Sequence, residues 1–301
     1  MRDVVIVGGG PAGLSAALVL SRCRRDVLMF DAGRGRNQRS RELHNFLTRN
    51  GVAPAEFRAM ARSELATLGV TVIEETVTDA ERRGAGFAVK AASGEWVESR
   101  KLLLATGVHD VLPTLDGLER MYGVSVHHCP YCDAYQHRDK RLAAYGKGTA
   151  AIGLALALRT WSRTVTALTD GEAVSEAWRT HARVNGIALR TERVSRLIGE
   201  GEQLRRVLLE SGEGVDCEAL FFNTGQVQRS ELGRKLGCEL MENGGIKTNV
   251  KQCAGVPGLF VAGDADKDVQ FVVCAAAEGA TAAVAINREL QDEERGKTPE
   301  A

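Results

Sequence analysis

The sequence lacks net charge, a long apolar run and a signal segment. Its 301 residues contain 39 Lys and Arg against 39 Asp and Glu, which argues against nucleic-acid or anionic-membrane binding, because both need a basic surface. No apolar run reaches the ~18 residues of a membrane span. The chain opens directly on a strand-like run, without the pattern of a secretory signal. We therefore expect a cytoplasmic protein with neither a membrane nor a nucleic-acid partner.

Aromatic residues are also scarce, at 5% of the chain, whereas glycine is abundant at 33 residues. Glycine at this level without a G-x-y repeat excludes collagen and predicts many tight turns. Seven cysteines, an odd number in a chain of this length, do not make a disulfide framework. The length favours two domains.

A glycine-rich turn lies near the N-terminus, in the motif Gly8-x-Gly10-x-x-Gly13. In such a motif the first glycine permits a tight turn, the second lets a pyrophosphate approach, and the third lets helix pack on strand. Asp31 stands where an acidic residue hydrogen-bonds a ribose. The motif does not by itself distinguish FAD from NAD. The elements predicted around it are a strand over 3–7, a helix over 14–22 and a strand over 26–30.

The same order of elements returns in the second half of the chain. A second glycine turn, Gly146-x-Gly148-x-x-Ala151, lies between a predicted strand and helix, and a further strand follows. The runs that end at Gly107 and Gly225 also resemble each other. The fold class is therefore α/β, with two Rossmann-like dinucleotide-binding domains built from duplicated βαβ units. Between the two glycine turns the sequence predicts a helix over 54–68, a strand over 70–75 and a small antiparallel hairpin over 86–98. Later elements are predicted over 142–145, 152–161, 164–168, 219–225, 258–264 and 272–290.

The most specific feature is the Cys129-Pro-Tyr-Cys132 motif. Two cysteines at this spacing can form a disulfide that interconverts with thiols through thiolate attack. Asp133 follows at once and can move the proton that a departing thiol needs, while His127 and His128 can favour a thiolate. A zinc site, the alternative, needs four ligands, and the sequence has no second CxxC. We therefore expect no metal.

Together these motifs resemble the low-molecular-weight thioredoxin reductases over nearly the whole chain. The resemblance implies an FAD-binding domain in two parts, 1–114 and 246–301. A second nucleotide-type domain, 115–245, carries the CxxC and is inserted between them. It also implies a homodimer whose partner is a thioredoxin-like protein or a small dithiol or disulfide. The motifs that carry it are Gly8–Gly13, Thr106-Gly107, Cys129–Cys132 with Asp133, the turn at Gly146, and Gly263-Asp264.

The resemblance also implies roles for individual residues. Cys132 faces the flavin, Cys129 exchanges with the partner disulfide, and Asp133 is the acid and base. Asn45 lies beside the flavin, and the helix after Gln270 points its N-terminus at it. The other FAD contacts implied are Gly8, Gly10, Pro11, Ala12 and Gly13 at the pyrophosphate, Asp31 at the adenosine ribose, Gly263 and Asp264 at the ribityl–phosphate region, and Thr106, Gly107 and Phe271.

The chain departs from the family at three places, of which the first bears on the electron donor. NADPH-dependent members carry a His-Arg-Arg cluster after the second strand of the inserted domain. Here that place reads Leu168-Thr-Asp170-Gly, with no basic residue over 164–178. An arginine fork recognises phosphate and an aspartate repels it, and Lys147 alone does not rebuild the cluster. Whether Gly146–Ala151 holds a second nucleotide or a second flavin stays open. In the second departure, Ala134 stands where the family commonly has glycine. In the third, Val269-Gln-Phe271-Val stands where family members typically have Arg-Gln-Ala next to the flavin. Phe271 either stacks on the flavin ring or belongs to the core.

The Cys-Pro-Tyr-Cys motif and the missing cluster also resemble flavin-dependent dithiol oxidases, which pass electrons from a dithiol to CxxC, flavin and oxygen. Those enzymes usually carry His where this chain has Asp133, so the direction stays open. We expect an FAD-dependent thiol/disulfide oxidoreductase that exchanges two electrons between flavin and the cysteine pair, without NADPH. The alternatives are an NAD(P)H-dependent thioredoxin reductase, a dithiol oxidase using oxygen, a ferredoxin-linked enzyme, a flavin-binding redox sensor and a zinc-stabilised nucleotide-binding module.

Overall fold

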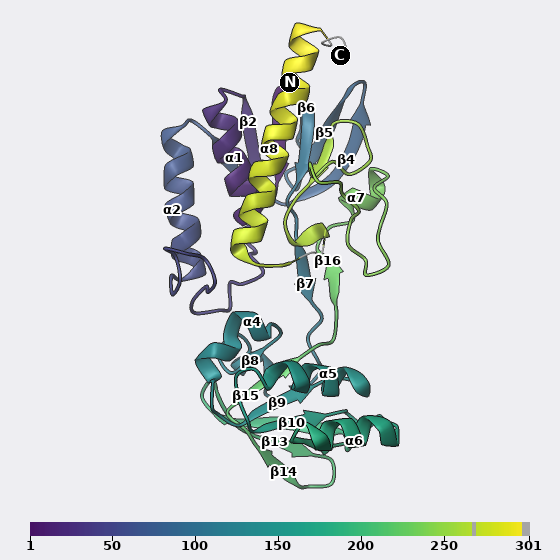
Figure 1. The fold of residues 1–301 in the computed structure, drawn as a ribbon. Helices are drawn as coiled ribbons and strands as arrows, with labels where there is room; N and C mark the ends of the chain where they lie inside the picture. The colour runs from purple at the N-terminus through teal and green to yellow at the C-terminus, as the bar shows by residue number, and fades with distance from the viewer. Residues whose placement is uncertain (267–268, 297–301) are drawn as a thin grey trace. The chain divides into compact units, whose positions relative to one another are not determined.

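The computed structural model describes residues 1–266 and 269–296, and it divides into two compact units (Figure 1). The first unit comprises Met1–Gln38, Asn45–His109 and Val227–Ala301, and the second comprises Arg39–His44 and Asp110–Gln226. The later boundary therefore lies at 226/227, whereas the sequence analysis placed it at 245/246. The physical reason is packing, because Leu232 and Leu236 join the core of the first unit.

The first unit is built on one mixed sheet in the order β3-β2-β1-β6-β5-β4, with β17 paired to β6. Strands β1, β2, β3, β6 and β17 are parallel, and β4, β5 and the first half of β6 form an antiparallel meander. The predicted hairpin at 86–98 is confirmed as β5–β6. The strands are β1 (Arg2–Val7), β2 (Val27–Phe30), β3 (Thr71–Ile73), β4 (Val77–Arg83), β5 (Gly86–Ala91), β6 (Trp96–Leu104) and β17 (Leu259–Val261).

Two helices of this unit, α1 and α8, lie side by side (Figure 1). Small residues make the close approach possible: a methyl group on Gly279 of α8 would lie 2.0 Å from the carbonyl oxygen of Ala12 in α1. The contact joins the N-terminal glycine turn to the last helix of the chain. The helices are α1 (Pro11–Arg22), α2 (Pro54–Thr67), α7 (Leu232–Lys235), the 3-10 helix η2 (Asp264–Asp266) and α8 (Val272–Arg295).

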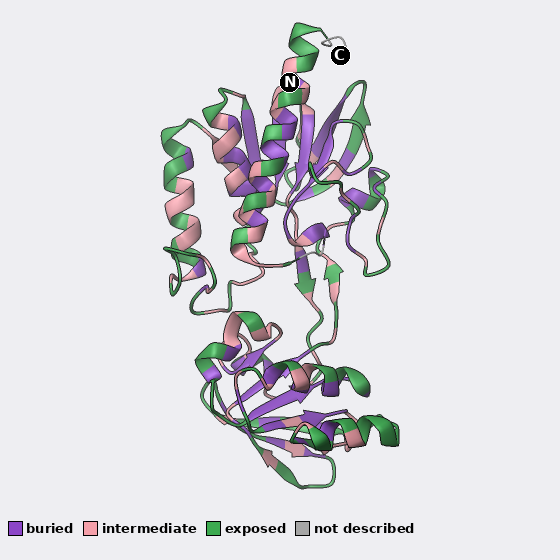
Figure 2. Cartoon of the chain, viewed as in Figure 1, coloured by how far each residue is buried: buried purple, intermediate pink, exposed green. Residues whose placement is uncertain are grey.

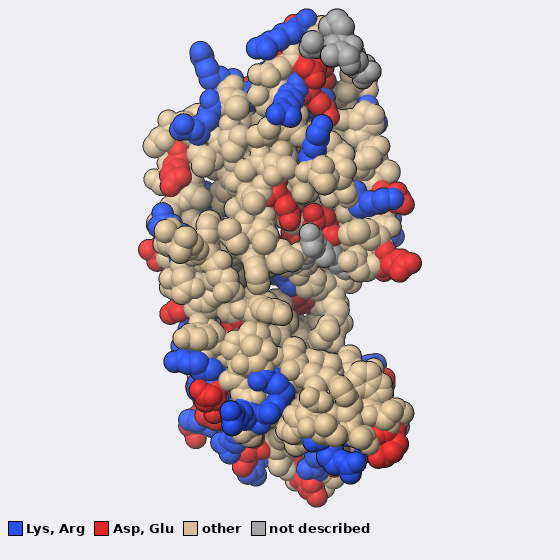
Figure 3. Space-filling model, in the orientation of Figure 1, with Lys and Arg blue, Asp and Glu red and all other residues tan. Residues whose placement is uncertain are grey.

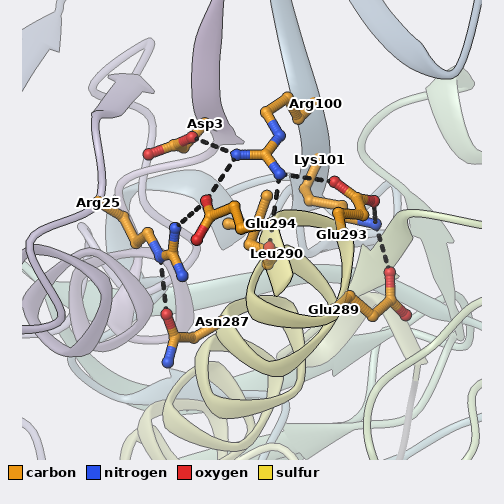
Figure 4. Close-up of polar contacts among 9 residues, drawn as sticks. All are labelled: Asp3, Arg25, Arg100, Lys101, Asn287, Glu289, Leu290, Glu293 and Glu294. Atoms are coloured by element: carbon orange, nitrogen blue, oxygen red, sulfur yellow. Dashed lines mark hydrogen bonds and ion pairs between the residues drawn. The ribbon is translucent and has the colours of Figure 1, made fainter. Parts of the chain in front are cut away.

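Ion pairs hold the C-terminal half of α8 against the start of β1 and the middle of β6 (Figure 4). Lys101, which is only 5% exposed, pairs with Glu289 at 2.6 Å and Glu293 at 2.7 Å. Arg100 pairs with Asp3, and with Glu293 and Glu294 of the helix. These ion pairs join segments almost 200 residues apart in sequence. They therefore help to hold in place α8, the helix that packs on α1 beside the glycine turn.

The second unit contains a five-stranded parallel sheet in the order β11-β10-β9-β15-β8. A separate antiparallel sheet follows the order β12-β13-β14. Residues Val108–Asp110 (β7) and Gln226–Gln228 (β16) pair with each other where the chain passes between the units. The strands are β8 (Val126–His127), β9 (Leu142–Tyr145), β10 (Val165–Leu168), β11 (Ile187–Arg190), β12 (Val194–Glu200), β13 (Gln203–Leu209), β14 (Gly214–Asp216) and β15 (Ala219–Phe222).

The helices of the second unit are mostly short. Helix α5 follows the second glycine turn, as the sequence predicts, although it begins at Thr149 and ends at Leu158. Two further turns of helix follow the first cysteine of the CxxC. The helices are α3 (Leu118–Met121), α4 (Pro130–Asp133), the 3-10 helix η1 (Ala134–His137), α5 (Thr149–Leu158) and α6 (Glu176–Val184).

Each unit has its own apolar interior (Figure 2). All four residues of β2, β9 and β15 are buried, which is typical of parallel strands covered on both faces. On the face drawn in Figure 3, acidic and basic side chains are interspersed. Across residues 1–266 and 269–296, no helix combines the length and apolar character that crossing a membrane requires.

Candidate active site

The first glycine turn joins β1 to α1, and its three glycines differ in their surroundings. A methyl group on Gly8, where φ is +116°, would lie 2.2 Å from the Ala105 carbonyl oxygen, and one on Gly13 would lie 1.9 Å from that of Gly8. Both positions therefore exclude a side chain. Gly10, in contrast, has no atom within 4 Å of such a methyl group, so the backbone is open to a ligand there.

The start of α1 provides free hydrogen-bond donors at this opening. The first bond of the helix runs from the Leu14 amide to the Gly10 carbonyl, so the amides of Ala12 and Gly13 have no carbonyl partner within the helix. Pro11 occupies the first helical position, and no side chain caps the end. Backbone amides at the positive end of a helix are suited to a phosphate.

Asp31 lies beside this turn, at the end of β2. Its side chain is next to Gly9, where a methyl group would lie 2.3 Å from Oδ2. One carboxylate oxygen accepts a hydrogen bond from the Gly33 amide at 3.0 Å, and the other pairs with Arg62 of α2. Arg62, which the sequence analysis missed, therefore orients the acid that is expected at the ribose.

The Gly263–Asp264 turn lies at the same edge of the first sheet. A methyl group on Gly263 would lie 2.9 Å from the Cβ of Ala12, and one on Gly107 would lie 4.0 Å from the Cβ of Asp264. The fold thus brings the two glycine turns and the end of β6 together. Thr106 follows β6 directly and is partly buried.

An arginine that the sequence analysis did not select connects two of the predicted FAD contacts. Arg36 donates hydrogen bonds of 2.8 Å to both Asp264 and Gln270. The Gly263 amide donates to Glu278 at 2.6 Å. The only sequence signal for Arg36 was its place in the basic loop after Asp31.

Two predicted flavin contacts lie in less regular structure. Asn45 is exposed and has a φ of +62°, and its amide donates to the side chain of Asn50. Phe271 is partly buried and caps the N-terminus of α8. Its role, as a flavin-stacking or a core residue, stays a prediction.

In the second unit, Cys129 and Cys132 form a disulfide. Cys129 caps the short helix α4, and its sulfur accepts a hydrogen bond from the Cys132 amide at 3.2 Å. Tyr131, between the two cysteines, is 68% exposed and contacts Trp161 edge-on. The motif is therefore partly exposed: Tyr131 faces solvent, and both cysteines are half-buried.

Asp133, the residue after the motif, contacts His127, which forms a buried pair with His137. Its Oδ2 lies 3.5 Å from Nδ1 of His127, and Nε2 of His127 lies 3.0 Å from Nε2 of His137. Burial raises the pKa of Asp133, but the interaction with His127 and the nearby His128 and His44 outweigh it, so the net shift is downward. Asp133 is thus a carboxylate near neutral pH.

His128 belongs to a separate polar cluster. Its Nδ1 lies 3.0 Å from the hydroxyl of Tyr122, and its Nε2 lies 3.6 Å from Asp110 of β7. Asp110 also accepts a hydrogen bond from Gln226 of β16. The two adjacent histidines therefore face different partners, and only His127 contacts Asp133.

Two acids and one arginine border the second glycine turn and the loop after β10. The arginine is Arg193, whose Nε lies 3.0 Å from where a methyl group on Gly171 would stand. Asp170 follows β10 and accepts hydrogen bonds from the Tyr145 hydroxyl and the Val194 amide. The carboxylate of Glu172 lies 2.9 Å from where a methyl group on Gly148 would stand. Lys147 is exposed. Sequence analysis selected Asp170 but missed Glu172, whose approach to Gly148 depends on the loop conformation.

No group of three or more His, Cys, Asp or Glu side chains in the part of the chain that the structure describes is arranged to hold a metal ion.

Comparison with known proteins agrees with this architecture. Residues 2–279 match the family model described as pyridine nucleotide-disulphide oxidoreductase. Thioredoxin reductase tcpT of Claviceps purpurea is 33% identical over 282 residues, which cover 87% of this chain and 86% of the relative.

Solved structures are similar over the same extent. The structure of HlmI is 35% identical, covers 97% of this chain and 93% of its own, and gives a TM-score of 0.94. An oxidoreductase from Agrobacterium tumefaciens is 32% identical, with coverages of 96% and 98% and a TM-score of 0.90. These matches confirm the α/β fold class, the resemblance to thioredoxin reductases and an FAD-dependent disulfide oxidoreductase. The chain belongs to the pyridine nucleotide-disulphide oxidoreductase family.

Proposed function

We propose that this protein transfers two electrons between FAD and the Cys129–Cys132 pair and exchanges thiols with a dithiol or disulfide partner, without using NADPH. The observation that carries the proposal is the partly exposed disulfide followed by an ionised Asp133. A partly exposed disulfide can be attacked by an external thiolate. A carboxylate next to it can take and return the proton that each exchange step moves.

The first unit fits FAD on structural grounds. Gly10 leaves the backbone open where Gly8 and Gly13 exclude side chains, and the free amides of α1 suit a pyrophosphate. We assign the diphosphate to Gly8–Gly13, the adenosine ribose to Asp31, and the flavin end to Asn45, Thr106, Gly107, Gly263, Asp264, Gln270 and Phe271. When bound, FAD would supply the two-electron redox chemistry, for which the protein provides binding and orientation.

The second glycine turn fits the 2′-phosphate of NADPH poorly. Asp170, held by the Tyr145 hydroxyl, stands where the family resemblance puts the basic cluster of NADPH-dependent members. Glu172 adds a second carboxylate beside Gly148. The carboxylates of Asp170 and Glu172 disfavour a phosphorylated nucleotide, and the positive charge that packs on this loop is that of Arg193, beside Gly171. A second nucleotide or a second flavin at Gly146–Ala151 stays part of the same proposal.

The relatives inform the choice of partner. The Claviceps relative is named a thioredoxin reductase, so a thioredoxin-like protein is one candidate and a small dithiol or disulfide is the other. As the family resemblance implies, we propose a homodimer in the cytoplasm, in which a two-part FAD domain encloses an inserted domain that carries the CxxC.

An anaerobic spectroscopic experiment tests the proposal. The purified protein should show flavin absorbance, and NADPH, NADH and dithiothreitol are then added in separate cuvettes. We expect dithiothreitol to bleach the flavin band and a stoichiometric amount of NADPH to leave it unchanged. Recovery of colour in air would indicate a dithiol oxidase, whereas rapid bleaching by NADPH would overturn the donor assignment.

Matched cysteine variants identify the thiols involved. Cys129→Ser should abolish bleaching by dithiothreitol, because the sulfur that exchanges with the partner is lost. Cys23→Ser, at an exposed cysteine outside the motif, should leave bleaching unchanged. Equal bleaching in both variants would show that the dithiol reduces the flavin without the Cys129–Cys132 pair.

A further inference from the structure

Arg36 joins two residues that lie 228 and 234 positions away in sequence. Its Nη1 atom donates hydrogen bonds of 2.8 Å to Oδ2 of Asp264 and to Oε1 of Gln270. The side chains of Arg36 and Asp264 are only 15% and 20% exposed. A guanidinium and a carboxylate at this distance form a charge-assisted hydrogen bond, and because this pair is mostly buried, solvent screens it less than it screens a surface pair.

The loop that carries Arg36 is held by close packing at the preceding residue. A methyl group on Gly35 would lie 2.5 Å from Nη1 of Arg58 in α2. The Gln38 amide donates to the Gly35 carbonyl at 3.3 Å, which closes the turn around position 36. Arg34, two positions before Arg36, is exposed. The fold therefore turns Arg36 inwards and leaves Arg34 in solvent.

Asp264 lies beside the turn that we assign to the diphosphate of FAD. A methyl group on Gly263 would lie 2.9 Å from the Cβ of Ala12 in the first turn of α1, and one on Gly107 would lie 4.0 Å from the Cβ of Asp264. The amides at the start of α1 favour an anion, whereas a carboxylate at the same edge repels one. Binding of a diphosphate here is therefore favoured when the charge of Asp264 is compensated.

Other acids at this edge increase the need for a positive charge. The Glu278 carboxylate of α8 accepts a hydrogen bond from the Gly263 amide at 2.6 Å. Asp266 is buried in the same 3-10 helix as Asp264. Arg36 brings its charge to this group of acids from the loop after β2.

The same guanidinium decides which way the Gln270 amide points. A guanidinium has donors and no acceptor, so the Gln270 atom that lies 2.8 Å from Arg36 is the side-chain oxygen. The amide nitrogen then lies on the side of the group away from that contact. Gln270 directly precedes Phe271, the N-cap of α8. Arg36 therefore fixes a hydrogen-bond donor at the start of the helix that is expected to meet the flavin.

We propose that Arg36 is a positioning residue for FAD, which compensates the Asp264 carboxylate beside the diphosphate turn and holds Gln270 with its amide nitrogen turned away from the guanidinium. The inference rests on the proposed binding of FAD by the first unit, and it adds a residue to which the family resemblance assigns no role. The role requires the positive charge of Arg36, because a neutral side chain leaves Asp264 uncompensated.

Variants at positions 36 and 264 separate the charge of Arg36 from its place in the loop. Arg36→Gln keeps a hydrogen-bond donor but removes the charge, whereas Arg36→Lys keeps the charge. Arg36→Gln combined with Asp264→Asn removes both charges and lets two amide groups pair. Arg34→Gln makes the same change of charge at the exposed arginine of the same loop, and it is the matched control.

The affinity for FAD is measured on the full-length flavoprotein without any turnover. The purified protein is diluted stepwise, the released FAD is separated by ultrafiltration, and its amount gives the dissociation constant; circular dichroism checks that each variant is folded. We expect Arg36→Gln to bind FAD about tenfold more weakly than the wild type. Arg36→Lys, Arg34→Gln and the double variant should each stay within about threefold of the wild type, because none of them leaves Asp264 uncompensated.

The outcomes distinguish this inference from the proposed function. If the wild-type protein holds no FAD, the proposed function fails. If it holds FAD, but Arg36→Gln binds FAD as tightly as the wild type, or Arg36→Lys loses as much affinity as Arg36→Gln, FAD binding stands and the role of the Arg36 charge is overturned. Should Arg36→Gln not fold, the double variant decides, because a loss of about tenfold or more in that variant contradicts charge compensation.

Discussion

The Tyr145 hydroxyl donates a 2.6 Å hydrogen bond to Asp170, joining the ends of adjacent strands β9 and β10. Burial raises the pKa of Tyr145, and the hydrogen bond and charge of Asp170 raise it further. The second oxygen of Asp170 accepts the Val194 amide. Two hydrogen bonds therefore hold the Asp170 side chain in place at the edge of the sheet where nucleotides bind in this architecture.

Removal of this charge should improve binding of NADPH. Asp170→Asn keeps an oxygen that can accept from Tyr145 but removes the negative charge, and we expect an approximately fivefold tighter NADPH dissociation constant. Glu172→Gln should act in the same direction. Equilibrium dialysis measures the change, and Glu176→Gln, an exposed charge change on α6, is the control. Unchanged affinity in both Asp170→Asn and Glu172→Gln would contradict the electrostatic explanation.

Gly279→Ala should disrupt the contact between α8 and α1. The added methyl group would lie 2.0 Å from the Ala12 carbonyl oxygen, so the helices must separate, at a cost of about 1–3 kcal/mol or more. Gly153→Ala, in the interior of α5 with no atom within 4 Å, should instead stabilise by about 0.5–1 kcal/mol. Urea unfolding of both variants tests the pair. A similar midpoint for the two would mean that the helix contact adapts at little cost.

Lys101→Met tests the ion pairs of Figure 4. Lys101 is buried, while Glu289 and Glu293 are about half exposed, so its loss should cost about 1–3 kcal/mol. Lys235→Met removes an exposed pair with Asp79 and should have little effect. Thermal unfolding of the two variants compares them directly. If Lys101→Met unfolds at the wild-type temperature, the network does not hold α8.

His137 should make the second unit sensitive to acid. Its pKa falls from 6.5 to about 4 on folding, so between these values the unfolded chain binds more protons than the folded one. Stability is therefore lost as pH decreases from about 6.5 to about 4, by up to about 3 kcal/mol. His137→Gln should lose less stability over this range. Unfolding midpoints at pH 7 and pH 4.5 measure the difference, and parallel losses in wild type and variant would argue against it.

Much of the fold was predictable from local sequence. The glycine turn between a buried strand and a helix, and its repetition after residue 142, predicted two Rossmann-like units, because strand burial and turn conformation depend on neighbouring residues. The start of α5 was predicted late, at 152 rather than Thr149. The three-residue strands β7 and β16 were missed, since they pair with each other across more than 100 residues of sequence.

The sequence by itself determined the chemical groups: the pyrophosphate turn, the cysteine pair with Asp133, and the absence of a basic cluster near Asp170 are all local patterns. Only the tertiary structure decided which distant side chains complete them. Arg36 contacts Asp264 across more than 200 residues of sequence, and His137 meets His127 through the turn that packs η1 against β8. Such contacts depend on how the chain folds back on itself, a relationship that no spacing along the chain reveals.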